Sequence, residues 1–176
     1  MLVSRYLVRT AAAVLLIATA SVGSTVSPKG NIVAAAQTSP DHKTLVAAVK
    51  AAKLVDTLAS KGPFTVFAPT DAAFARLPAG TLETLLKPEN SDHLVKILTF
   101  HVVAGQYNAA AILQLISQGN GEAKLTTVEG SQLTAKLVDG KVVVVDENGG
   151  VATVIQPDLM QSNGIIHVTD AVSLPA

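Results

Sequence analysis

The spacing of apolar residues changes once along this chain, and this change constrains the fold more than any other feature. In most segments up to Ser117, apolar residues recur at helical intervals, as they do over 94–101. Beyond residue 122 the interval becomes two, and Asp139-Gly140 is a strong signal for a two-residue hairpin turn. Helices that crowd the first half and antiparallel strands that fill the second are typical of an α+β fold.

Capping and turn residues place the individual elements. We expect two short helices over 44–58 with a bend near Lys53, and the further helices are expected over 71–77, 81–86 (with Thr81 as cap), 90–101 and 109–117. Strands are expected over 64–68, 124–128, 131–138, 141–145, 151–156 and 165–168. Leu133, Ala135 and Leu137 alternate with polar residues, which predicts that all three face the core.

A sharp turn from strand to helix is expected at Pro69 and Thr70. Proline biases the residue before it to an extended conformation, and Thr70 can cap the free backbone N–H groups of the next helix. Pro69 and Phe74 then occupy the two positions of a hydrophobic staple. Asp71 places negative charge at the positive end of the helix dipole, and this structural explanation leaves a general-base role with little support.

Residues 1–24 have the layout of a secretory signal peptide. Two arginines precede an apolar run over 11–18, and the strongest A-x-A cleavage site lies after Ala20, with Ser24 and Ala36 as alternatives. An uncleaved membrane anchor is the competing interpretation, but spanning a bilayer needs roughly 20 apolar residues and this run is shorter. We therefore expect a secreted protein, either extracellular or periplasmic.

The rest of the chain is expected to be a linker over 25–30 and one domain over 31–176. A chain of 176 residues is too short for two ordinary domains once a leader is removed. The 13 Lys and Arg residues balance 13 Asp and Glu residues, so no basic excess favours nucleic acid as a partner. The absence of Cys from the sequence excludes disulfides and thiolate nucleophiles.

Two segments resemble the two signature boxes of fasciclin domains, namely 65–74 (TVFAPTDAAF) and 163–175 (NGIIHVTDAVSLP). Between them, 98–105 resembles the tyrosine-histidine segment of that family, and 45–58 resembles its opening helical pair. The resemblance covers residues 30–176. Its signature residues in this sequence are Thr65, Phe67, Pro69, Thr70, Asp71, Phe74, Asn163, Gly164, His167 and Asp170.

The resemblance implies a wedge of about seven mostly antiparallel strands, with several short flanking helices in the N-terminal half. It also implies an extracellular or surface protein that mediates adhesion and does not catalyse a reaction. A single exported domain is similar to the short bacterial members of the family.

In animal matrix members, the tyrosine-histidine segment and a Glu-Pro-Asp-Ile-Met segment are implicated in receptor binding. The matching residues, and hence the candidate partner-binding residues, are Phe100, His101, Gln156, Pro157, Asp158, Leu159 and Met160. Phe replaces the tyrosine and Gln replaces the Glu, so the hydroxyl and the carboxylate that a polar partner would use are missing. Burial of Leu159 and Met160 in the core is the competing interpretation of the second segment.

No catalytic, cofactor-binding or metal-binding residue is predicted. The four histidines lack ligand spacing, and His101 and His167 lie in apolar runs, where a buried imidazole needs only a fixed hydrogen-bond partner. We expect one of these two to bond to the turn around Thr70 and Asp71. The loop over 146–149 lacks the ligand series of a calcium loop and is interpreted as a solvated turn.

Three functions are compatible with these observations. The first is a non-enzymatic adhesion or interaction module that recognises a surface protein, a matrix component, a glycan or a second copy of itself. The second is a carrier of a hydrophobic small molecule or pigment, held in an apolar cleft between strands and helices. The third is an enzyme with an unfamiliar site.

Overall fold

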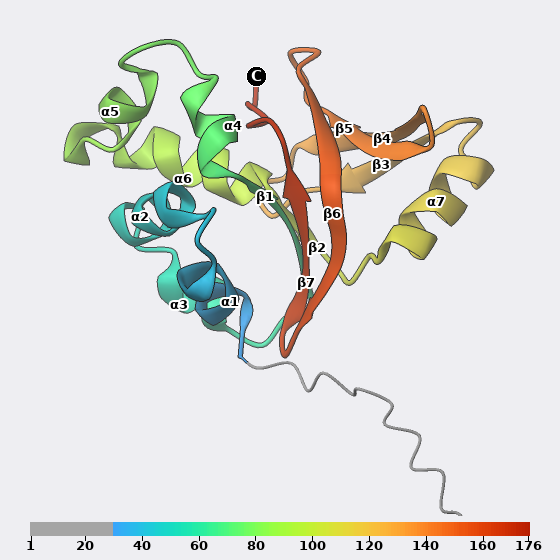
Figure 1. The fold of residues 1–176 in the computed structure, drawn as a ribbon, viewed down its shortest axis with the longest axis horizontal. Coiled ribbons are helices and arrows are strands. Elements are labelled where there is room, and N and C mark those ends of the chain that lie inside the picture. The colour runs from blue at the N-terminus through green and yellow to red at the C-terminus, as the bar shows by residue number, and fades with distance from the viewer. Residues whose placement is uncertain (1–29) are drawn as a thin grey trace, which may run out of the picture.

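The computed structural model describes residues 30–176, in which helices lie on both sides of a curved sheet (Figure 1). The helices are α1 (Ile32–Thr38), α2 (Lys43–Ala51), α3 (Val55–Ala59), α4 (Asp71–Ala75), α5 (Thr81–Leu85), the 3-10 helix η1 (Pro88–Asn90), α6 (Ser91–Phe100) and α7 (Ala109–Gln118). The strands are β1 (Phe64–Pro69), β2 (Val102–Ala104), β3 (Glu122–Thr126), β4 (Gln132–Val138), β5 (Lys141–Val145), β6 (Val151–Gln161) and β7 (Gly164–Thr169).

The strands of this part of the chain form one sheet in the order β2-β1-β7-β6-β5-β4-β3. Neighbouring strands are antiparallel except β1 and β7, which run parallel over their full lengths. The sheet curls until its two edges meet, where the Val128 N–H donates to the Val102 carbonyl at 2.7 Å. The predicted α+β fold of about seven mostly antiparallel strands with short N-terminal helices is confirmed.

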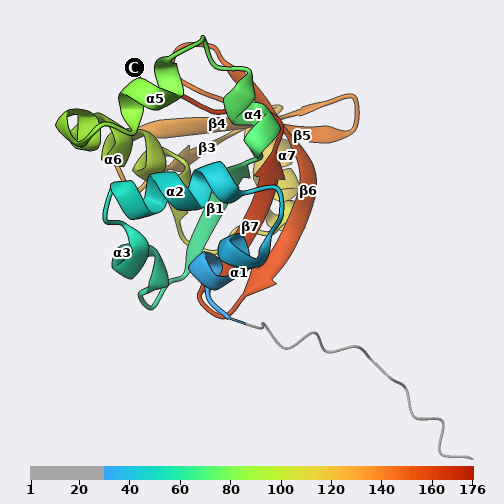
Figure 2. The same ribbon diagram turned by 60° about the vertical axis from the view of Figure 1, so that its left-hand side comes forward.

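Two hydrophobic cores hold the helices to the sheet. The first lies between β1, β7 and the helices α1 to α6, and Figure 2 shows α1 and α2 in front of these two strands. Its buried residues include Leu45, Val49, Val66, Leu98 and Ile166. The second lies mainly between α7 and the strands β3 to β6, with Phe67 of β1 at its side, and it also includes Ile112, Leu125, Leu133 and Val144. Because the central strands contribute to both cores, the sheet and its two helical layers form one packed body.

The strand-to-helix turn at Thr70 forms as predicted. The Thr70 side chain accepts a hydrogen bond from the Ala73 N–H at 3.2 Å, so it caps α4. Asp71 begins that helix and accepts a bond from the Thr44 N–H at 2.8 Å, which ties α4 to the start of α2. Phe74 is buried in the first core, and this contact helps to fix the direction in which α4 leaves the sheet.

Several local predictions were incomplete or wrong. Helix α1 was not predicted, although Asn31 caps it by accepting a bond from the Ala34 N–H at 2.9 Å. Helix α5 is capped at Gly80 rather than at the predicted Thr81, because the left-handed backbone of Gly80 places it outside the helix. Leu137 is 48% exposed, since it lies near the end of β4, beyond the layer that α7 covers.

Strand β6 is longer than predicted, because it continues past Pro157 to Gln161. Proline has no N–H to give to a sheet, so it normally ends a strand or lies on an edge. In β6 the pairing with β5 covers only Val151–Thr153, and the pairing with β7 shifts register on both sides of Gln156. The proline therefore occupies a place where no ladder bond to β5 is required.

The predicted signal peptide over 1–24 and nearly all of the predicted linker over 25–30 lie outside the described residues. Within residues 30–176, no helix is both long enough and apolar enough to cross a membrane.

Candidate functional site

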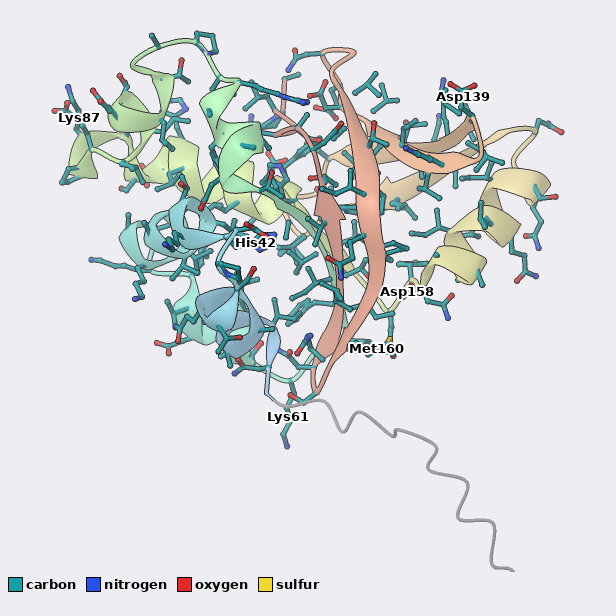
Figure 3. The ribbon with its side chains drawn as sticks, in the orientation of Figure 1. His42, Lys61, Lys87, Asp139, Asp158 and Met160 are labelled. Carbon is teal, nitrogen blue, oxygen red and sulfur yellow. The ribbon has the colours of Figure 1, made fainter. Side chains whose placement is uncertain are left out.

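The second half of β6 presents an exposed surface along an irregular strand. Beyond Thr153 this strand pairs with β7 alone in the described part of the chain. Ile155 and Met160 are 54% and 50% exposed, and Gln156, Pro157 and Asp158 between them are exposed as well. We call Ile155, Gln156, Pro157, Asp158 and Met160 the β6 surface; Figure 3 labels its Asp158 and Met160.

The predicted partner-binding segment, residues 156–160, thus lies partly on the surface and partly in the core. Leu159 is half-buried and packs against the first core, so the expectation of an inward side chain holds for this residue. Met160 points outward, and the expectation that it packs inward is wrong. Ile155 was not singled out from the sequence, although an apolar residue directly after the buried Val154 breaks the alternation that a half-exposed strand would show.

His167 fixes the backbone of the β6 surface from behind. Its Nδ1 accepts a hydrogen bond from the Asp158 N–H at 3.2 Å, and its Nε2 donates to the Tyr107 carbonyl at 2.8 Å. The imidazole also stacks on Phe67, with ring centroids 5.4 Å apart. These contacts hold Asp158 in a left-handed conformation with φ of 60°.

The Asp158 side chain is also used within the fold. Its Oδ1 accepts a bond from the Ala109 N–H at 2.7 Å, at the first turn of α7. Asn108 caps the same helix by accepting from the Ala111 N–H at 2.7 Å. The β6 surface is therefore attached to α7 and to β7, which leaves its backbone little freedom to move.

Phe100 and His101 lie inside the protein, with exposed fractions of 0% and 3%. The expectation that they contact a partner is therefore corrected: neither side chain reaches the surface. His101 instead donates from Nδ1 to the Ile97 carbonyl at 2.8 Å and accepts at Nε2 from the Ser173 N–H at 3.0 Å. This residue joins the end of α6 to the C-terminal segment.

Both buried histidines are neutral for the same physical reason. Burial lowers the pKa of His101 and of His167 below the ordinary value, because a charged imidazole would lose its hydration. In each ring one nitrogen accepts a backbone N–H bond, and protonation of that nitrogen would remove the bond. The prediction that one of them bonds to the turn around Thr70 and Asp71 is wrong, since their partners lie elsewhere.

Asp71 has separate partners and takes part in no shared site with the histidines. Burial acts to raise its pKa, but hydrogen bonds from Thr44 and Lys43 outweigh that effect and lower the pKa below its ordinary value. The carboxylate therefore stays charged and holds two helices together. Among residues 30–176, no group of three or more His or acidic side chains lies close enough together to bind a metal ion.

The loop over 146–149 forms a turn in which residues 147–149 are exposed, as predicted, but Asp146 at its start is not solvated. Asp146 is buried, and its carboxylate accepts bonds from the N–H groups of Asn148, Gly150 and Leu174 at 3.0, 2.6 and 2.9 Å. Asn148 in turn donates to the carbonyls of Leu174 and Pro175 at 3.1 Å. The loop thus binds the C-terminal segment to the sheet.

An apolar cavity lies beneath α1, bounded by α2, α3, α6 and β1. It has a volume of about 30 Å³, and its lining includes Ile32, Val49 and Leu98. A second cavity, of about 50 Å³, lies on the other side of α1 and is lined by His42 and Ile166. The Nε2 of His42 is buried and has no hydrogen-bond partner among the described residues.

Comparison with known proteins identifies the family. The model of the fasciclin domain matches residues 40–175. Protein sll1483 of Synechocystis is 54% identical over 82% of this chain and 73% of its own length, and the immunogenic protein MPB70 of Mycobacterium bovis is 38% identical over 82% and 68%.

A solved structure, that of a FAS1 domain pair from the insect cell adhesion molecule fasciclin I, has the same fold. Its TM-score is 0.73 at 24% identity, and the match covers 82% of this chain and 51% of that chain. Together with the family match, this likeness bears out the resemblance of the two signature segments. The chain belongs to the fasciclin family.

Proposed function

We propose that this chain is an exported adhesion module, which binds a protein or glycan outside the cell and catalyses no reaction. The contact is made by the β6 surface. The observation that carries this proposal is the pair of half-exposed apolar side chains, Ile155 and Met160, at the two ends of a rigid strand segment. The likeness to an insect cell adhesion molecule supports the same class of function.

The β6 surface has the composition of a small interface. Apolar side chains near the middle of an interface provide most of its binding energy, and polar groups around them fix the orientation. Here Ile155 and Met160 supply the apolar contacts, while Gln156 supplies an amide and Asp158 a carboxylate. Because His167 and Asp158 already fix the backbone, little conformational entropy is lost on binding.

The experiment is a clustering assay with beads that carry the exported chain. Ile155→Asp combined with Met160→Asp should abolish bead clustering and cell attachment, because each charge would have to be desolvated in the contact. Leu113→Asp combined with Val138→Asp is the matched control, since both residues are similarly exposed (40% and 48%) but lie on α7 and at the end of β4. Circular dichroism must show that both variants are folded.

Equal clustering by the wild type and the β6 variant would refute the β6 surface as the contact. Mixed beads, with wild type on one colour and the variant on the other, distinguish self-association from a contact with another molecule. Failure of the wild type to bind either cells or itself at micromolar concentration would refute the adhesion proposal.

A carrier of a hydrophobic small molecule is the second candidate, favoured by the apolar cavity beneath α1. The unpartnered His42 Nε2 lies in the second cavity, on the other side of α1, so it would bind a polar end group of a ligand that extends past this helix. A volume of about 30 Å³ is far below the roughly 300 Å³ or more of a small-molecule pocket, so a pigment or lipid fits only if α1 moves outward. Because a carrier would require this movement of α1, we rank it below the adhesion module.

The carrier is tested on protein purified from its native host. Organic extraction followed by mass spectrometry should recover a stoichiometric apolar compound, and His42→Phe should reduce the recovered amount. An extract without such a compound, together with no binding of a fatty acid or a carotenoid by the wild type, would refute the carrier.

A further inference from the structure

A polar hollow opens at the end of the fold where three loops meet. The loops are α3–β1 (60–63), β2–α7 (105–108) and β6–β7 (162–163), and the start of α1 completes the rim. The hollow has a volume of about 470 Å³, which is within the usual range for small-molecule sites. In Figure 3 the labelled Lys61 and Met160 lie toward this same end of the molecule.

Amides, hydroxyls and one ammonium group dominate the lining. The polar residues are Asn31, Ser60, Lys61, Gln106, Gln161, Ser162 and Asn163. No Asp or Glu lines the hollow among the described residues, so Lys61 gives it a positive charge. The side chains of Lys61, Gln106 and Gln161 make no hydrogen bond or ion pair with the rest of the described chain, which leaves their donors and acceptors available to a ligand.

The walls of the hollow are held in place by a network beneath these free side chains. Asn163 accepts from the Ile32 N–H at 2.9 Å and donates to the Leu58 and Ser60 carbonyls at 2.7 and 2.9 Å. A bond of 3.1 Å from the Gly105 N–H to the Pro63 carbonyl joins the other two loops. The hollow is therefore preformed, and binding would cost mainly the ordering of a few side chains.

We infer that this hollow binds an acidic sugar unit of a polysaccharide. A sugar presents hydroxyl groups that both donate and accept, and carboxamides such as those of Gln106 and Gln161 have one acceptor and two donors to match them. Lys61 favours a sugar that carries a carboxylate, because its ammonium group would form a charged hydrogen bond with that carboxylate. The inference rests on the proposed function and assigns the glycan part of the adhesive partner.

The hollow lies at the end of the strand that carries the β6 surface, because Gln161, which lines the hollow, is the last residue of β6. A polysaccharide chain that extends from the hollow would pass the end of β6, near Met160 of the surface assigned above to the adhesive contact. One partner could therefore contact both the hollow and the β6 surface. Substitutions in one of them test its contribution separately from that of the other.

The test is an NMR titration of the full exported chain with a trigalacturonate and with a neutral galactose trisaccharide of the same length. The acidic probe should shift resonances of residues that line the hollow. Lys61→Gln should weaken its binding about fivefold and leave the neutral probe unaffected, whereas Gln161→Ala should weaken both about tenfold. Lys87→Gln, at an exposed lysine on the opposite side of the molecule (Figure 3), is the matched control and should change neither.

Shifts that map elsewhere, or no binding of either probe at about 10 mM, would overturn the sugar site. Equal binding of both probes that is insensitive to Lys61→Gln would overturn the preference for an acidic sugar. Bead clustering that depends on Ile155 and Met160 would still support the proposed function in those cases, so the two failures can be told apart.

Discussion

Acid should destabilise this protein well before its carboxylates titrate, because two neutral histidines are buried in it. In the unfolded chain both have the ordinary pKa of 6.5, and in the folded chain burial lowers the pKa of each. The unfolded state therefore binds more protons as the pH falls below 6.5, and the free energy of unfolding decreases with falling pH. Well above pH 6.5 both histidines are neutral in the folded and in the unfolded chain, so they no longer lower the free energy of unfolding.

The magnitude follows from the number of groups. Each buried histidine changes the free energy of unfolding by about 1.4 kcal/mol per pH unit once the pH is below its unfolded pKa. Between about pH 7 and about pH 5.5 the two histidines together should remove up to about 2.5 kcal/mol, as long as both stay neutral in the folded state. Asp and Glu titrate mainly below this interval, with ordinary pKa values near about 4.

Urea unfolding followed by circular dichroism, at several pH values in that interval, measures this slope. His101→Gln should lower stability at neutral pH, because the ring and its bond to the Ile97 carbonyl are lost, but it should also halve the slope. His93→Gln, at an exposed position, is the control and should leave the slope unchanged. A slope in His101→Gln equal to that of the wild type would refute the assignment of a neutral buried imidazole.

Substitutions at three further positions test the scaffold by the same unfolding measurement. Asn163→Ala removes three hydrogen bonds and should lower the free energy of unfolding by about 2–4 kcal/mol. A loss below about 1 kcal/mol would contradict the role of Asn163 in connecting the β6–β7 loop to α1 and α3. Gly164→Ala should prevent folding, because a Cβ there would lie 2.0 Å from the Phe64 carbonyl oxygen; a soluble variant with native circular dichroism would disprove this. Asp158→Ala should lower the free energy of unfolding by about 1 kcal/mol, because the Ala109 N–H loses its acceptor. Asp158→Asn keeps an acceptor and should lower it less. Equal losses in the two variants would argue against the cap.

Local chemistry made much of the fold predictable. Thr70 as a cap and Asp139-Gly140 as a hairpin turn each act through neighbours in sequence, so their effect can be read without knowing the rest of the chain. Strand β2 was not predicted, because three residues directly after a helix carry too short a pattern. What makes it a strand is pairing with β1 and with residues 127 and 128, which are distant in sequence.

The candidate site was less predictable, because burial there depends on tertiary neighbours. Phe100 packs in the second core and His101 bonds to the Ser173 N–H, and these partners come from parts of the chain that are distant in sequence. The partners of His167 on Tyr107 and Asp158 are separated from it by 60 and 9 positions, and no periodicity encodes such contacts. The hollow arises where three loops meet, so its residues carry no common motif in sequence.

The parallel pairing of β1 with β7 has a consequence for biosynthesis. These strands adjoin each other in the middle of the sheet, yet Phe64 pairs with Gly164, one hundred positions later. A ribosome must therefore add one hundred residues after Phe64 before the central pair can close, and contacts so remote in sequence slow folding. A domain whose central strands pair this late stays unfolded for longer during synthesis, which would suit the export proposed above.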